Sequence, residues 1–437
     1  MRKIINHMPF SSPPYMNDVL PYPSPGNNWL HSGRWRWVEY RFRRVCRCYG
    51  YREIRTPILE LTDLFVRSVG EGTDIVSKEM FNLVDRGGRR LSLKPEGTAP
   101  VVRAIIEHEL LAAHPLLKLY YIGQTFRNER GQKGRYRQHQ QLGVEAFGSA
   151  DPALDAEVIE LAVRFFREIG ITDQQLQINS VGCPNCRPAY REGLKKWVKP
   201  FLSEMCGDCK TRYEVNPLRM LDCKVPHDVE ILSGAPKLLD WLCEDCREHF
   251  NSLRRHLEAM SVPYQIAPQL VRGFDYYTKT AFEITSGVLG SQNALGGGGR
   301  YDGLVEDCGG PATPGIGFGL GMERCLIAME SLGIEIEPED EAPTVFLVAL
   351  GESARSAAVR LLTEIRSAGI AADMDYVGKG LKAQMRLADK LKAPLVLLIG
   401  ENELKGGVVS FRNMQTSQQE MIPQGEVIRR IQSWAKN

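Results

Sequence analysis

The chain has 437 residues, of which 43% are hydrophobic, and its formal net charge is only +2. At roughly 100–200 residues per domain, this length predicts two to four globular domains with sizeable cores. A charge so close to neutral excludes a uniformly basic protein, so any binding of nucleic acid must rely on local basic patches. No segment approaches the ~20 apolar residues of a membrane span, and we expect a soluble, cytoplasmic protein that does not bind membranes.

The first predicted elements are a helix and a strand. The spacing of apolar residues over 29–49 predicts an amphipathic helix, which Gly50 ends. The segment 52–65 then predicts a strand, and its Pro57 suits an edge or interface strand. A helix and a strand that only pack in the core, without any interface, would explain the same pattern.

The segment LSLKPEGTA follows at residues 91–99. If it is extended, Lys94, Glu96 and Thr98 lie on one face, because side chains alternate along a strand. A turn followed by a helix N-cap is the alternative.

Residues 118–148 predict two strands joined by a basic loop, RGQKGRYRQ. Alternation places Arg127 and Glu129 on one face of the first strand, and Gln141 and Glu145 on one face of the second. As an antiparallel pair, the strands would present these four side chains on one polar floor backed by apolar residues. Such a floor predicts a binding site, although a solvated hairpin face would look the same.

Seven of the eleven cysteines fall between residues 179 and 260. They form three CxxC pairs and one single residue, Cys223. Nineteen residues separate the first two pairs, which fits a zinc pattern. We therefore expect a structural zinc in a helical insertion, although thiols without metal would be compatible with the pattern. The four predicted ligands are Cys183, Cys186, Cys206 and Cys209.

The end of the chain has a different pattern. Residues 329–342 are acidic and contain proline, as is typical of a linker. Beyond residue 343, strands alternate with helices, which predicts a small α/β domain with a largely parallel sheet.

Four segments together resemble the histidyl-tRNA synthetases, a family of class II aminoacyl-tRNA synthetases. Two of them, QLVRGFDYYTKTAFEI (269–284) and GGGGRYDGL (296–304), resemble motifs found in histidyl enzymes; the other two, FRNERGQKGRYRQ (126–138) and GIGFGLGMERCL (315–326), resemble general class II motifs. The resemblance implies an α+β catalytic domain, residues 1–328, with a mixed, mainly antiparallel sheet. A helical cysteine-rich insertion (183–258) interrupts it, and a linker (329–342) leads to an α/β anticodon-binding domain (343–437).

The implied activity is ATP-dependent ligation of histidine to tRNA(His) by a homodimer that uses Mg²⁺, with a structural Zn²⁺ as an additional candidate. Arg127 and Arg272 are the implied catalytic residues, which neutralise charge at the α-phosphate. Segment 52–65 resembles the motif that carries the dimer interface. The implied histidine-binding residues are Glu96, Thr98, Gln141, Glu145, Tyr276, Tyr277 and Tyr301. The implied ATP-binding residues are Arg127, Glu129, His139, Arg272 and Arg324, and those for tRNA are Gln132, Lys133 and Arg135.

Several positions depart from the family's pattern. Pro14 and Tyr15 replace an arginine-glycine pair, Gly131 replaces a proline, and His139 and Gln140 replace phenylalanine and histidine. A second hypothesis is therefore a catalytically silent paralogue that binds histidine and regulates an ATP phosphoribosyltransferase, or a divergent second synthetase copy. Such regulators typically lack the anticodon domain and the intact arginine motif (residues 269–284, with Arg272), both of which this sequence has.

Overall fold

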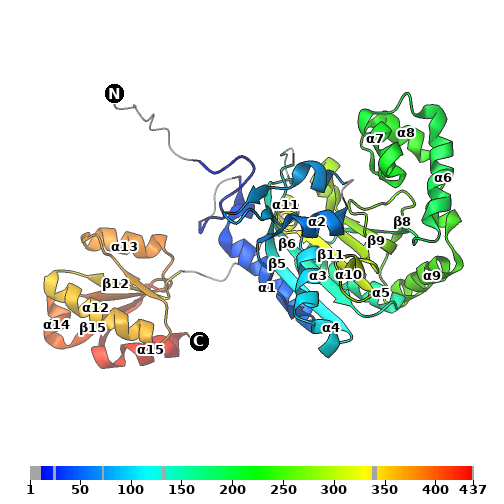
Figure 1. Ribbon diagram of the computed structural model, residues 1–437. Helices are drawn as coiled ribbons and strands as arrows, with labels where there is room; N and C mark the ends of the chain where they lie inside the picture. The colour runs from blue at the N-terminus through cyan, green and yellow to red at the C-terminus, as the bar shows by residue number, and fades with distance from the viewer. Residues whose placement is uncertain are drawn as a thin grey trace, which may run out of the picture. The chain divides into compact units, whose positions relative to one another are not determined.

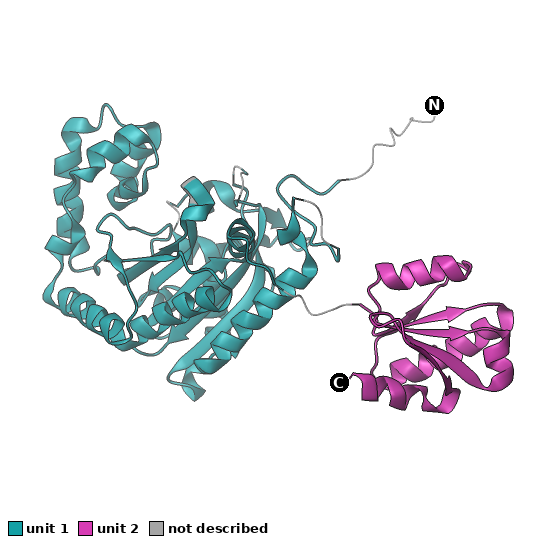
Figure 2. Ribbon diagram, turned by 180° about the vertical axis from the view of Figure 1, so that it is seen from behind, with its two compact units in different colours: residues 1–338 teal, residues 339–437 magenta. Residues whose placement is uncertain are grey.

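The computed structural model describes residues 11–22, 26–70, 73–129, 131, 134–336 and 342–435, without the side chains of 291 and 292. The chain divides into two compact units at residues 338 and 339 (Figure 1, Figure 2). This division lies within the predicted linker. In the described residues, no helix is long and apolar enough to cross a membrane.

Among the described residues, eight strands form the mixed sheet of the first unit, in the order β1-β5-β6-β11-β10-β9-β7-β8. The five inner pairings are antiparallel, whereas β1–β5 and β7–β8 are parallel. The predicted mixed, mainly antiparallel sheet is therefore confirmed. The strands are β1 (Arg52–Glu53), β5 (Leu117–Phe126), β6 (Gln138–Phe147), β7 (Gln175–Ser180), β8 (Gln265–Ile266), β9 (Thr278–Thr285), β10 (Ala294–Arg300) and β11 (Gly315–Gly321).

One face of this sheet is covered by helices that form the main core with it. Phe42 of α1 packs edge-on against Phe165 of α5, and both are fully buried. Helix α5 begins where Asp151 accepts a hydrogen bond from the Ala153 N–H, with proline at its first position. The helices of this unit outside the insertion are α1 (Ser32–Cys48), α2 (Thr62–Val69), α3 (Thr98–Glu107), α4 (Leu110–Ala113), α5 (Pro152–Glu168), α9 (Glu244–Ala259), α10 (Leu304–Asp307) and α11 (Met322–Ser331).

A small antiparallel sheet lies apart from the large one. It has the order β2-β4-β3 and comprises β2 (Leu59–Leu61), β3 (Asn82–Val84) and β4 (Arg90–Leu93). Some of its apolar side chains are exposed to solvent: Leu61 is 55% exposed and Val84 is 67% exposed.

The cysteine-rich insertion begins after β7 and contains α6 (Arg187–Val198), α7 (Gly207–Val215) and α8 (Pro226–Ser233). These helices project from the sheet together (Figure 1). Helix α9 differs, because its Phe250, Leu253 and Leu257 are buried in the main core. From Phe250 onward, this part of the predicted insertion thus packs with the main core of the sheet.

The second unit contains a five-stranded sheet in the order β13-β12-β14-β15-β16, as far as the structure describes it. Strands β13, β12 and β14 are parallel, but β14–β15 and β15–β16 are antiparallel. The prediction of a largely parallel sheet missed β16, which a tight turn returns beside β15. Asn413 sets that turn by accepting hydrogen bonds from two backbone N–H groups. The elements are β12 (Val345–Ala349), α12 (Glu352–Ser367), β13 (Ala372–Met374), α13 (Leu381–Lys390), β14 (Leu395–Ile399), α14 (Glu401–Gly406), β15 (Val408–Asn413), β16 (Gln419–Pro423) and α15 (Val427–Trp434).

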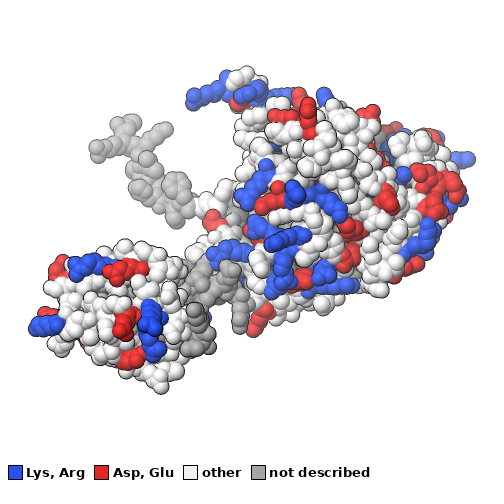
Figure 3. All heavy atoms as spheres, turned by 90° about the horizontal axis from the view of Figure 1, so that it is seen from below, with Lys and Arg blue, Asp and Glu red and all other residues white. Residues whose placement is uncertain are grey.

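The surface charge agrees with the near-neutral balance of the sequence. On the face that Figure 3 shows, basic and acidic side chains are interspersed rather than gathered into one basic surface. Binding of a polyanion must therefore rely on local groups of arginine and lysine.

Candidate active site

The hairpin of β5 and β6 forms the floor of the site. Gly123 pairs with Gln141 in its antiparallel register. Leu142 and Val144 are fully buried in the core behind the sheet. Gln141 and Glu145 face the other way, so the predicted alternation along β6 is confirmed.

Glycines allow the polar side chains to lie flat on this floor. A Cβ at Gly143 would come within 2.0 Å of the Tyr121 ring, and one at Gly317 within 2.0 Å of the Glu145 carboxylate. Tyr121 is a site residue that the sequence reasoning missed. Its position two residues before Gly123 was the available signal, because strand residues two apart share a face.

Glu145 is fully buried and surrounded by hydroxyl groups. Thr98 Oγ1 donates to its Oε1 at 2.7 Å and Tyr121 Oη at 3.3 Å, while Tyr301 donates to its Oε2. Burial raises the pKa of Glu145 to about 8, although the hydrogen bonds from Tyr301 and Thr98 oppose that shift. The structure thus brings three predicted histidine-binding residues, Thr98, Glu145 and Tyr301, into direct contact.

Glu96 lies at the N-terminus of α3. Its carboxylate accepts hydrogen bonds from the backbone N–H groups of Thr98 at 2.6 Å and Ala99 at 2.8 Å. The segment is therefore not extended through Thr98, because β4 ends at Leu93 and the first helical turn needs acceptors for its free N–H groups. Glu96 caps the helix while remaining buried beside Thr98, and burial raises its pKa.

Aromatic rings form one wall of the site. Tyr276 stacks on Phe274, with ring centroids 5.1 Å apart, and lies 4.7 Å from the Tyr277 ring. Tyr276 also meets Tyr301 edge-on at 5.7 Å. The structure thus brings the three predicted tyrosines together.

The two arginines predicted to be catalytic come from separate segments. Arg272 Nη1 pairs with Glu283 Oε2 at 2.8 Å, and its Nε is buried without a hydrogen-bond partner among the described residues. Arg127 follows the end of β5, and its guanidinium lies 5.8 Å from the centroid of the Phe274 ring. Both guanidinium groups thus adjoin the same segment, 272–277.

Arg324 lies near the loop between β5 and β6. Its Nε donates to Gly134 O at 2.9 Å and its Nη1 to Ala294 O at 2.6 Å, which ties that loop to β10. Burial, together with the charges of Arg127 and Arg324, lowers the pKa of His139 to about 3. The imidazole of His139 is therefore neutral at physiological pH.

Gln140, one of the departures from the family pattern, faces α1. Its Nε2 donates to Glu39 Oε1 at 2.8 Å, and its backbone N–H donates to Glu323 Oε1 at 2.9 Å. Burial raises the pKa of Glu323 to about 8. Gln140 thus contributes to packing between β6, α1 and α11.

Two other departures form a contacting pair. Tyr15 has a φ of 62°, a backbone conformation that favours glycine, and its carbonyl accepts a hydrogen bond from the Arg137 N–H at 2.9 Å. A Cβ at Gly131 would lie 2.1 Å from the Tyr15 ring. Glycine at 131 therefore leaves the space that the ring occupies, a relation that the sequence alone did not reveal.

Of the predicted RNA-binding residues, Gln132 and Lys133 lie outside the described residues. Arg135 is exposed, and its Nη1 pairs with Glu129 Oε2 at 2.9 Å. Glu129 also lies 3.9 Å from Arg127 Nη1.

The four predicted zinc ligands do not lie together. Cys183 and Cys186 lie with Cys243 and Cys246, whereas Cys206 and Cys209 lie with Cys223 and Asp228. Helix α6 begins directly after Cys186, and its 12 residues rise by about 18 Å, which carries the chain away from the first pair. Spacing alone could not reveal that the third pair returns to the first.

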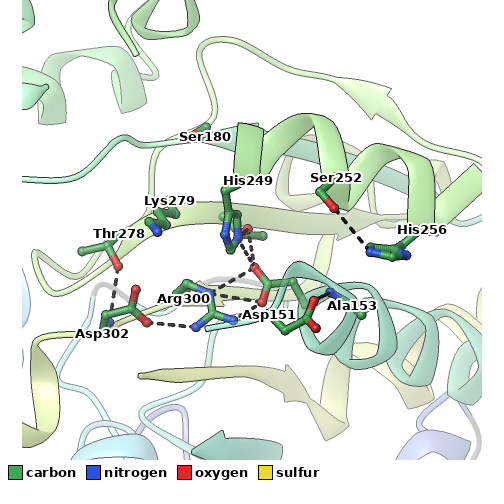
Figure 4. Close-up of polar contacts among 12 residues, drawn as sticks. Asp151, Ala153, Ser180, His249, Ser252, His256, Thr278, Lys279, Arg300 and Asp302 are labelled. Atoms are coloured by element: carbon green, nitrogen blue, oxygen red, sulfur yellow. Dashed lines mark hydrogen bonds and ion pairs between the residues drawn. The ribbon is translucent and has the colours of Figure 1, made fainter. Parts of the chain in front are cut away.

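A buried polar network links the motif GGGGRYDGL to the helices. Arg300 Nε donates to both carboxylate oxygens of Asp155, at 3.1 and 3.2 Å, and Arg300 Nη1 donates to Ser149 O at 3.0 Å. From α9, His249 Nε2 lies 2.9 Å from Asp155 Oδ2. Figure 4 shows Arg300 and His249 converging from separate elements.

The charges of this network decide the ionisation of Asp155. Burial acts to raise the pKa of Asp155, but the hydrogen bond with His249 and the Arg300 charge outweigh it and lower the pKa. The sequence reasoning missed Asp155 and His249, because neither lies in a recognisable motif.

Comparison with known proteins places the chain in a family. A family model described as Histidyl-tRNA synthetase matches residues 31–185 and 202–325, and a model described as Anticodon binding domain matches residues 344–434. The Histidine--tRNA ligase of Moorella thermoacetica is 52% identical over 396 residues, which cover 91% of this chain and 93% of that protein.

Two solved structures are also similar. The apo histidyl-tRNA synthetase of S. aureus has a TM-score of 0.80 and 37% identity, and the match covers 97% of this chain and 99% of that one. An ATP phosphoribosyltransferase regulatory subunit/histidyl-tRNA synthetase from Bacillus halodurans C has a TM-score of 0.62, with 90% of this chain and 99% of that one covered; at 22% identity it supports the fold alone. The chain belongs to the histidyl-tRNA synthetase family.

Proposed function

We propose that this protein is a histidine–tRNA ligase, which activates histidine with ATP and transfers it to tRNA(His). The observation that carries the proposal is the buried Glu145, held by Thr98, Tyr121 and Tyr301 beside the two tyrosines of the arginine motif. An acid at this depth suits an imidazole N–H, because a site built for a ring donor rejects analogues that lack one.

Histidine binding is proposed to divide between two sets of residues in this site. We assign the imidazole to Glu145 and Tyr277, and the α-ammonium to Glu96, Thr98 and Gln141. Gln141 Oε1 is buried without a hydrogen-bond partner among the described residues, so it is free to accept from a ligand. The carboxylate of Glu96 offers the charge that a buried ammonium requires.

Activation of histidine depends on positioning its carboxylate against ATP and on neutralising the negative charge at the α-phosphate. The histidine carboxylate attacks the α-phosphorus, pyrophosphate leaves, and Arg127 and Arg272 stabilise the negative charge that gathers there. Arg324 and the neutral His139 are the proposed partners of adenine. Magnesium, which accompanies ATP, prefers oxygen ligands, and the Glu129 carboxylate beside Arg127 is one such donor.

Histidine-dependent exchange of pyrophosphate into ATP tests the proposal. The wild-type protein should catalyse it, and Arg272→Ala should lower kcat/KM by about 100-fold or more while histidine still binds. Arg255→Ala is the matched control, because Arg255 pairs with Glu248 at the surface. Histidine binding without any exchange in the wild-type protein would instead favour the regulatory paralogue.

The proposed partners include a second copy of the chain. The exposed apolar side chains around β2 and β3, Leu61 and Val84 among them, support a homodimer at the segment that resembles the interface motif. Leu61→Asp combined with Val84→Asp should convert the dimer to a monomer in sedimentation velocity. Unchanged sedimentation would exclude this surface.

The RNA partner is proposed to contact the loop between β5 and β6 as well as the second unit. Arg135 supplies a phosphate contact, and Gln132 and Lys133 remain candidates from the sequence. A cytoplasmic location accompanies this function and stays a prediction.

A further inference from the structure

The insertion contains two groups of metal-ligating side chains. At its base, the Sγ atoms of Cys183, Cys186, Cys243 and Cys246 all lie within 4.8 Å of one another. Cys183 Sγ is 3.7 Å from both Cys186 Sγ and Cys243 Sγ, and Cys186 Sγ is 3.9 Å from Cys246 Sγ. Four thiolates at the corners of a tetrahedron around zinc would be about 3.8 Å apart, since a Zn–S bond is about 2.3 Å.

The second group lies further into the insertion. Cys206 Sγ is 3.9 Å from Cys223 Sγ, and Cys223 Sγ is 3.3 Å from Asp228 Oδ2. Cys209 completes this group within the same 4.8 Å limit. A sulfur and an oxygen bound to one zinc would be about 3.5 Å apart, which matches this arrangement.

Backbone donors surround both groups. The Cys183 N–H donates to Cys186 Sγ at 3.1 Å, and the Cys209 N–H donates to Cys206 Sγ at 3.4 Å. The Cys206 N–H donates to Asp228 at 3.2 Å. Hydrogen bonds of this kind orient metal ligands and stabilise their charged forms.

The feature that points most directly to a cation is the buried carboxylate of Asp228. Asp228 is only 1% exposed, and in the described part of the chain its carboxylate forms no ion pair with a lysine, arginine or histidine; the neighbouring Lys224 and His227 pair with Asp222 and Glu204 instead. A buried carboxylate without a positive partner carries a large desolvation cost. Hydrogen bonds from the Cys206 N–H and Cys223 Sγ offset part of that cost, and a divalent cation among Asp228 and three thiolates would offset the rest.

We propose that the insertion binds two zinc ions, one at the four-cysteine base and one at the tip formed by Cys206, Cys209, Cys223 and Asp228. Together the two sites use all seven cysteines of the insertion. The other four cysteines, Cys46, Cys48, Cys308 and Cys325, lie elsewhere in the chain.

The two metals would hold the insertion against the arginine motif. From the base, Arg187 follows Cys186 and donates to Tyr277 O. From the tip, Asn216 donates to Asp275 Oδ1 at 2.8 Å, and Arg219 donates to Gly273 O at 3.0 Å. Asn216 and Arg219 lie between Cys209 and Cys223, so a metal that joins those cysteines fixes the turn that carries them.

Metal analysis of the full-length protein, purified without chelator, tests the proposal. We expect about two zinc ions per chain, and about one in Cys246→Ser and in Cys223→Ser. Cys48→Ser and Asp208→Asn should each retain both, because these exposed residues lie outside the two groups. A single zinc in the wild-type protein, or none, would overturn the proposal.

Cobalt substitution gives a readout that does not depend on a variant losing its fold. In the Cys246→Ser background only the tip site remains, and Asp228→Cys should raise its thiolate-to-cobalt charge-transfer absorption by about one third, from three sulfur ligands to four. No increase would exclude Asp228 as a ligand. Removal of zinc by a chelator should raise KM for histidine more than KM for ATP, and equal KM values before and after removal would exclude the link to the arginine motif.

Discussion

Glu145 shows how burial and hydroxyl donors adapt one carboxyl group to a ligand. We expect Glu145→Gln to raise KM for histidine by about 5- to 30-fold, because an amide cannot pass a proton to the bound imidazole and so cannot form the charge-assisted hydrogen bond that a carboxylate and an imidazolium make. KM for ATP should change much less. Steady-state exchange kinetics with each substrate varied check this, with the exposed Glu248→Gln as control. An equal rise in KM for ATP would instead assign Glu145 to a network that supports the structure of the site.

The pKa of Glu145 also predicts how stability depends on pH. The folded chain holds this proton up to about pH 8, whereas an unfolded glutamate releases it near its ordinary value of 4.5. Between these values the folded state binds more protons, so the free energy of unfolding falls as pH rises, by up to about 1.4 kcal/mol per pH unit. Urea unfolding across pH 5–8 should show a shallower fall in Glu145→Gln. The variant should still show part of the fall in the free energy of unfolding, because the pKa of Glu323 is also raised.

Tyr15 and Gly131 should behave as a coupled pair. Gly131→Pro alone should lower kcat/KM for ATP in the exchange reaction, because the new ring meets Tyr15. In a Tyr15→Gly background the same change should be tolerated, with a coupling free energy of about 0.5–3 kcal/mol. A double-mutant cycle measures that coupling, and additive effects would show that the two positions are independent.

At the scale of elements, the Arg300 network joins β10 to α5 and α9. Arg300→Met leaves Asp155 buried without its cation and should lower the free energy of unfolding by about 3–5 kcal/mol. Urea unfolding measures this. Arg255→Met, at an exposed ion pair, should change it by no more than about 0.5 kcal/mol. A loss as small as the control's would mean that His249 and Thr280 satisfy Asp155 without Arg300.

At the scale of the whole molecule, the two units have separate hydrophobic cores. The buried clusters of the second unit comprise residues 345 to 431, and those of the first unit end at residue 329. A protein ending at residue 338 should therefore keep histidine-dependent exchange near the wild-type rate. Its aminoacylation of tRNA should fall by about 100-fold or more, because contacts from the second unit are lost. Equal loss of both activities would show that the first unit depends on the second.

The sequence by itself determined the features that depend on neighbouring residues. The alternation of Gln141 and Glu145 with buried Leu142 and Val144 follows from the period of a strand, and Gly50 ends α1 through its positive φ. Each of the four motifs that resemble the family is likewise a short run of neighbouring residues. These signals are local, so no knowledge of the fold is needed to read them.

The tertiary structure alone decided which distant residues meet. Asp155 and Arg300 are 145 positions apart in the sequence, and Cys183 and Cys243, which lie side by side, are 60 positions apart. Spacing favoured Cys206 and Cys209 as partners of the first cysteine pair, but α6 carries the chain away and α9 brings the third pair back. Contacts of this kind depend on how helices pack against a sheet, and sequence periodicity does not encode which segments will become neighbours.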